Sequence, residues 1–89
     1  MAEPLRYRIV ISRKAEKEAE HITPLHRDRI DKAILSLAAD PRPHACKKLT
    51  HKEGYRIRVG NYRVLYTVDD QAKAVVIYRI KTKGKGTYR

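Results

Sequence analysis

The first half of the chain begins with the pattern of a strand followed by a short helix. Residues 5–11 alternate between apolar and polar positions and are rich in residues that favour strands, which predicts a β-strand. Ser12 suits an N-cap, and residues 13–21 consist mostly of helix formers. A helix is therefore expected directly after the strand.

A second helix is predicted from Pro24 to about Ala39. Thr23 followed by Pro24 is a recognised start signal, and apolar residues then recur at the spacing of one helical face. The segment 40–43, which contains two prolines, ends this helix. Because so few residues separate the two helices, they should form an antiparallel hairpin.

From residue 46 onward the pattern changes to the period of two that is typical of strands. Residues 47–49 suit a short edge piece, and Gly60-Asn61 is a two-residue hairpin signal. The expected strands cover 55–59, 62–68 and 73–80, with a turn at 69–72. The tail 81–89 is basic and contains glycine, so its composition predicts mobility.

A run of helices followed by a run of strands indicates an α+β fold. We expect residues 1–89 to form one domain with an N-terminal strand, a two-helix antiparallel hairpin and an antiparallel meander of about three strands. Both helices should cover the sheet face that carries Ile57, Val59, Val64, Tyr66 and Val68. The period of two then places three arginines together on the open face, namely Arg56, Arg58 and Arg63.

The charge is concentrated in the second half of the chain. The formal net charge is +11, and residues 47–89 contribute +9 of it, with twelve Lys/Arg and three Asp/Glu. Such asymmetry favours a polyanionic partner, with nucleic acid first and an acidic protein second. A membrane surface fits less well, because the basic half does not form an amphipathic helix.

The chain carries no membrane or export signal that the sequence reveals. No window approaches the roughly 18 apolar residues of a spanning helix, and the N-terminus lacks the pattern of a signal peptide. We therefore expect a cytoplasmic location.

Convergent arginines on an open sheet face suit phosphate binding. The guanidinium group offers a planar fork of donors that matches phosphate oxygens, and it stays charged at any relevant pH. Nearby tyrosines could stack on splayed bases. The alternative is that basic residues at exposed strand positions serve solubility and block edge pairing.

The sequence contains few of the residues that metal or thiol chemistry would need. The second half has only Glu53, Asp69 and Asp70 as carboxylates, which argues against a metal nuclease, and no cofactor is expected. Cys46 is the single cysteine and is interpreted as a partly buried structural thiol. Of the four histidines, interpreted as ordinary surface residues, His51 is the one that precedes a meander strand.

Residues 48–66 resemble the signature of the RelE/ParE toxin superfamily. In that family a leucine and a glycine precede a basic strand, and a Gly-Asp/Asn-Tyr-Arg hairpin follows. Here the matching residues are Leu49, Gly54, the strand Tyr-Arg-Ile-Arg-Val and the hairpin Gly-Asn-Tyr-Arg. The initial strand, the helical hairpin that ends at a proline turn and the final Tyr-Arg agree as well.

The resemblance implies metal-independent cleavage of mRNA in the ribosomal A site by a toxin of a type II toxin–antitoxin system. It implies that Arg63 holds the scissile phosphate, that Lys83 protonates the leaving 5′-oxygen and that Tyr88 stacks on or orients the nucleotide. Lys81 and Lys85 are alternatives for the acid, because the tail is about one residue longer than in the family. The residues expected to bind RNA phosphates are Arg56, Arg58, Lys48, Lys52, Lys81 and Lys85.

Two questions stay open at this level. Both basic positions of the first meander strand are Arg, whose pKa is too high for an ordinary base, so either Tyr88 or His51 is the base or catalysis is mainly electrostatic. The superfamily also includes ParE-type gyrase inhibitors that do not cut RNA, and a non-toxic nucleic-acid-binding member is a third possibility.

The resemblance also implies partners. These are the ribosome with its mRNA and a cognate antitoxin whose segment, acidic by charge complementarity, would wrap the toxin and cover the basic face. Operator DNA would be bound only indirectly, through the antitoxin.

Overall fold

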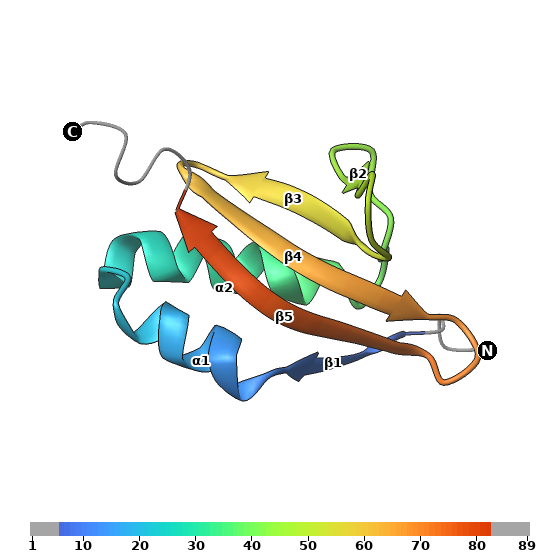
Figure 1. The fold of residues 1–89 in the computed structure, drawn as a ribbon. Coiled ribbons are helices and arrows are strands. Elements are labelled where there is room, and N and C mark those ends of the chain that lie inside the picture. Colours follow the sequence, from blue (N-terminus) through green and yellow to red (C-terminus); the bar gives the residue numbers. More distant parts are fainter. Residues whose placement is uncertain (1–5, 83–89) are drawn as a thin grey trace.

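A five-stranded sheet forms one layer of the protein, and two helices cover one of its faces (Figure 1). The computed structural model describes residues 6–82. Its elements, in chain order, are β1 (Arg8–Ile11), α1 (Arg13–Glu20), α2 (Pro24–Ser36), β2 (Lys47–Lys48), β3 (Tyr55–Val59), β4 (Tyr62–Asp69) and β5 (Ala74–Thr82). The α+β class and the placement of both helices on one face confirm the prediction.

The strands lie in the order β1-β5-β4-β3-β2. β3, β4 and β5 form the expected antiparallel meander, and β2 is the expected edge piece beside β3. β1 pairs with β5 in parallel. β1 begins at Arg8, later than the pattern predicted, and residue 5 lies outside the described range.

The helices begin where the capping signals predict. Ser12 Oγ accepts a hydrogen bond from the Ala15 backbone N–H at 3.1 Å, which caps α1. α2 ends at Ser36, three residues before the predicted end. The next residues tighten into a turn, in which the Ala39 N–H donates to Ser36 O at 3.3 Å ahead of the proline segment.

The core lies between the helices and the predicted face of the sheet. Ile57, Val64 and Tyr66 are buried there, and Val59 and Val68 pack partly buried against them. The hydroxyl of the fully buried Tyr66 donates to Pro41 O at 2.8 Å, so its polar end is paired. This confirms the inward-facing set that the period of two predicted.

β5 runs two residues further than the sequence predicted. Lys81 and Thr82, which were assigned to the mobile tail, pair with Arg63 and Tyr62 of β4. The prediction from composition was therefore wrong about the start of the tail, because residues 81 and 82 belong to β5. The pairing with β4 extends the sheet and fixes Lys81 on it.

A polar cluster joins the proline segment to the β4–β5 turn. Arg42 contacts Asp70 at 2.7 Å and donates from Nε to Tyr55 Oη at 2.9 Å, and Tyr7 Oη donates to Asp70 Oδ1 at 2.6 Å. The hydrogen bonds from Arg42 and then from Tyr7 lower the pKa of Asp70 to about 2. We call these four residues the Arg42 cluster.

Candidate nucleic-acid interface

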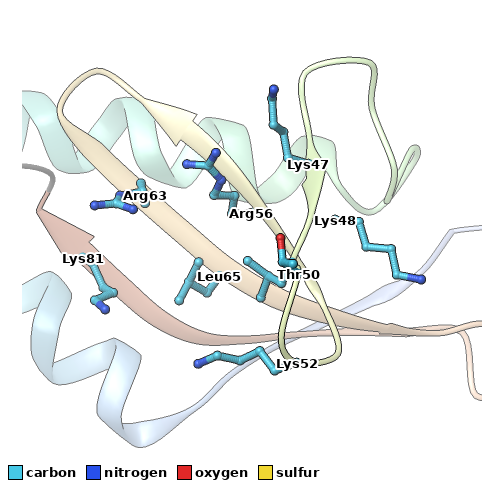
Figure 2. Close-up of a pocket in the computed structure, with 9 residues that line it drawn as sticks. Lys47, Lys48, Thr50, Lys52, Arg56, Arg63, Leu65 and Lys81 are labelled. Carbon is cyan, nitrogen blue, oxygen red and sulfur yellow. The ribbon is translucent and has the colours of Figure 1, made fainter.

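A cationic groove lies on the face of the sheet that the helices leave uncovered (Figure 2). Its lining combines basic side chains with an apolar floor and a threonine. The residues are Lys47, Lys48, Leu49, Thr50, Lys52, Arg56, Arg63, Leu65 and Lys81. As far as residues 6–82 form it, this lining holds no carboxylate and no imidazole, and its basic side chains suit an anion.

The register of the sheet brings these cations together. Arg56 of β3 lies opposite Lys47 of β2 on one side and opposite Leu65 of β4 on the other. Arg63 of β4 lies opposite Lys81 of β5. Because cross-strand partners share a face, each of four neighbouring strands contributes at least one cation to the groove that contains the nearly buried Leu65.

The loop before β3 adds a further cation from outside the sheet. It closes on itself through a hydrogen bond from Leu49 N to Gly54 O at 2.9 Å. Gly54 has φ 119°, and a Cβ there would lie 2.7 Å from Tyr66 O, so glycine is required. The loop places Lys52 Nζ 6.0 Å from the centre of the Tyr78 ring on β5.

Arg63 has a buried donor with no partner among the described residues. Its Nε is buried and meets no hydrogen-bond partner within residues 6–82. Buried donors are nearly always paired, because an unpaired one costs about 1–3 kcal/mol. Among residues 6–82, the Arg63 Nε and the Tyr78 hydroxyl are the buried side-chain polar atoms without such a partner.

Arg58 belongs to a neighbouring hollow. It shares the open face with Arg56 and Arg63, as predicted, and lies directly opposite Arg63. Together with Ala45, Lys47 and Arg56 it lines a separate depression beside the cationic groove. The two hollows share Lys47 and Arg56, so the basic surface continues across β3 toward β2.

Sequence reasoning missed one cation of the groove and named other residues that lie outside the described range. Lys47 was not among the predicted site residues, although its pairing with Arg56 places it in the groove lining. Lys48 and Lys52 line the groove as well, and the Lys48 side chain points away from Arg56 and Arg63 (Figure 2). The predicted site residues that lie outside the described range are Lys83, Lys85 and Tyr88.

The remaining candidates lie apart from the groove. His51 is exposed and does not belong to its lining. Cys46 is partly buried against the core, which agrees with its predicted structural role. Within residues 6–82, no three His, Cys, Asp or Glu side chains come together in a way that could hold a metal ion, and neither helix is long and apolar enough to cross a membrane.

Solved RelE-type toxins have the same fold. The archaeal RelE–RelB complex from Pyrococcus horikoshii OT3 contains a chain with a TM-score of 0.77 at 26% identity, over 91% of this chain and 99% of that chain. A chain of the RelBE2 complex from Mycobacterium tuberculosis gives 0.78 at 25% identity, over 88% and 99%. The isolated RelE toxin of E. coli gives 0.76 at 23% identity, over 86% and 84%.

The fold of this chain is thus that of the RelE-type toxins. A family model described as the ParE toxin of the type II toxin-antitoxin system parDE matches residues 9–85. The chain belongs to this family, within the RelE/ParE superfamily, and is a toxin of a type II toxin–antitoxin system. No curated protein matches the sequence.

Proposed function

We propose that this toxin is a ribosome-dependent endoribonuclease that cleaves mRNA in the ribosomal A site without a metal ion. The observation that carries the proposal is the convergence of cations from four neighbouring strands around Leu65, with the Arg63 Nε donor unpaired. Arginine forks match phosphate oxygens, and an apolar floor within a ring of cations suits a ribose or base.

The proposed reaction begins with attack of the ribose 2′-oxygen on the adjacent phosphorus, and the proton of the 2′-hydroxyl passes to a water molecule. The bond from phosphorus to the 5′-oxygen breaks, which leaves a cyclic phosphate and a new 5′-hydroxyl. Arg63 would hold the scissile phosphate, and Arg56 would offset the charge that grows on its equatorial oxygens. Either Lys81 or Lys83 would give the leaving oxygen its proton; Lys81 already lies in the groove.

Dependence on the ribosome follows from what the groove lacks. The part of its lining that lies within residues 6–82 offers no carboxylate or imidazole that could act as an ordinary base. An in-line geometry of the 2′-oxygen can replace much of that help, because orientation alone contributes several kcal/mol to catalysis. We propose that the ribosome imposes this geometry on the message, and we expect free RNA to be cut poorly.

A ParE-like inhibitor of gyrase is the second candidate, and the description of the matching family model favours it. Such a toxin would act by binding and would need no convergent phosphate site. The groove and the unpaired Arg63 donor therefore support RNA cleavage over this alternative.

We further propose that a cognate antitoxin covers the cationic groove. Relatives with the same fold are solved as complexes with RelB antitoxins. The charge of the groove favours an acidic segment of the partner. Operator DNA would then be bound through the antitoxin alone.

Primer extension on a translated mRNA in a cell-free system tests the proposal. Wild type should produce cuts in codon phase that require the ribosome, and Arg63→Ala should produce none. Arg29→Ala is a matched control, because it removes the same charge from an exposed position on α2. Undisturbed translation without cuts would refute the nuclease, and a supercoiling assay with gyrase would then decide the alternative.

A further inference from the structure

The end of β5 runs past the strand beside it. β1 pairs only with Ala74–Ile77 of β5, so the stretch from Tyr78 to Thr82 has β4 on one side and no strand of the described chain on the other. Backbone groups at such an edge need other partners, or the strand frays. This stretch carries Lys81 into the cationic groove.

Glu18 of α1 takes the place of the missing strand. Its Oε1 accepts the backbone N–H of Ile80 at 2.7 Å, and its Oε2 accepts Nε–H of Arg79 at 2.8 Å. Both side chains of the Glu18–Arg79 ion pair are largely shielded, with 23% and 33% of their surfaces exposed. One carboxylate thus holds the backbone at Ile80 and keeps the neighbouring guanidinium occupied.

The contact lies one residue before Lys81. On its other side, β5 is held through the pairing of Lys81 with Arg63. Glu18 and β4 therefore fix this end of β5 from both edges, and the Lys81 ammonium depends on both for its place.

We propose that Glu18 is a positioning residue that holds the end of β5 and thereby sets Lys81 beside Arg63 for RNA cleavage. This inference rests on the proposed function and deepens it. Glu18 acts through the backbone N–H of Ile80 and is not part of the groove lining, although it lines a neighbouring hollow together with Arg79 and Lys81.

Single-turnover cleavage of ribosome-bound mRNA tests the proposal. Glu18→Ala should slow the cleavage step roughly 10-fold, because small displacements of a charged group cost this much or more. Glu18→Gln should recover part of the rate, since its amide oxygen can still accept the Ile80 N–H. Glu20→Ala, which removes an exposed acid from the same helix, should leave the rate unchanged.

The sign of the effect separates positioning from simple electrostatics. Removal of an acid near a basic groove should strengthen attachment to RNA, which would lower KM and leave the cleavage step alone. Positioning predicts a slower cleavage step instead. A drop in KM without a change in the cleavage rate would overturn the proposal.

A double-mutant cycle with Lys81 supplies the second readout. If Glu18 acts through Lys81, Glu18→Ala should add almost no loss once Lys81→Ala is present. A general structural role would instead multiply both losses, and that result would refute the inference.

Amide exchange keeps this test distinct from the test of the nuclease. The Ile80 amide should exchange faster in Glu18→Ala, while the core amide of Val64 should keep its protection. Fast exchange at Ile80 together with an inactive wild type would overturn the nuclease proposal, and with it any catalytic role of Glu18. Unchanged exchange at Ile80 would overturn the role of Glu18 alone.

Discussion

Replacement of Arg63 by methionine tests whether this arginine lowers the free energy of unfolding while it supports RNA cleavage. Methionine fills the space of the arginine stem and keeps its apolar contacts, but it lacks the guanidinium group and with it the buried Nε donor that has no partner in residues 6–82. An unpaired buried donor costs about 1–3 kcal/mol. Arg63 also lies opposite two like charges, Arg58 and Lys81, and such pairs cost up to about 1 kcal/mol each.

The loss of the unpaired donor and of the two like-charge pairs should both stabilise the variant. The lost solvation of the exposed guanidinium nitrogens offsets part of this gain. We expect Arg63→Met to raise the free energy of unfolding by about 1 kcal/mol. For a protein of this size that corresponds to roughly 4–8 °C in the melting temperature. Cleavage of ribosome-bound mRNA should be lost at the same time, which is the pattern of a site kept for function at the expense of stability.

Urea unfolding followed by circular dichroism measures the first effect, and primer extension measures the second. Arg29→Met on the exposed face of α2 is the control, and it should leave both unchanged. An Arg63→Met variant that unfolds at lower urea than wild type would refute the reasoning, because Arg63 would then be a structural residue.

Three further predictions concern the fold around the groove. Gly54→Ala should destabilise the protein by about 1–3 kcal/mol, because φ 119° is strained for alanine and the new Cβ would meet Tyr66 O. Gly60→Ala, where nothing lies within 4 Å, should cost less in the same thermal melt. Tyr66→Phe should cost about 1–2 kcal/mol, measured by urea unfolding, because it leaves the carbonyl of Pro41 without its buried donor. Asp70 has a lowered pKa of about 2, so its contribution is complete above about pH 5 and is lost as the pH falls toward 2. The urea midpoint of wild type should therefore drop over that window by more than the midpoint of Asp70→Asn does.

The central part of the site could be predicted from the sequence because a local pattern encodes it. Strict alternation over residues 55–59, a two-residue turn and a second alternating run fix which side chains share a face. That logic put Arg56, Arg58 and Arg63 on the open face and Ile57 in the core, and both predictions are confirmed.

The edges of the site depend on pairings that no local pattern contains. Lys47 joins the groove through a two-residue strand, which is too short to show alternation. Lys81 was assigned to a mobile tail because glycines follow it, and cross-strand pairing with β4 overrides that composition. Glu18 reaches Ile80 across 62 positions of sequence, a distance over which spacing carries no information.

The ion pairs of the described residues leave the groove cations free for the two proposed partners, RNA and the antitoxin. The ion pairs of residues 6–82 join Lys32 to Asp28, Arg42 to Asp70 and Arg79 to Glu18, and all of them lie outside the groove lining. The groove cations therefore repel one another without an internal counter-charge, and a polyanion relieves that repulsion when it binds. Under the proposed function, the RNA backbone and an acidic antitoxin segment would seek the same charges. Binding of one would then exclude the other, and the antitoxin would need no contact with a catalytic base in order to inhibit the toxin.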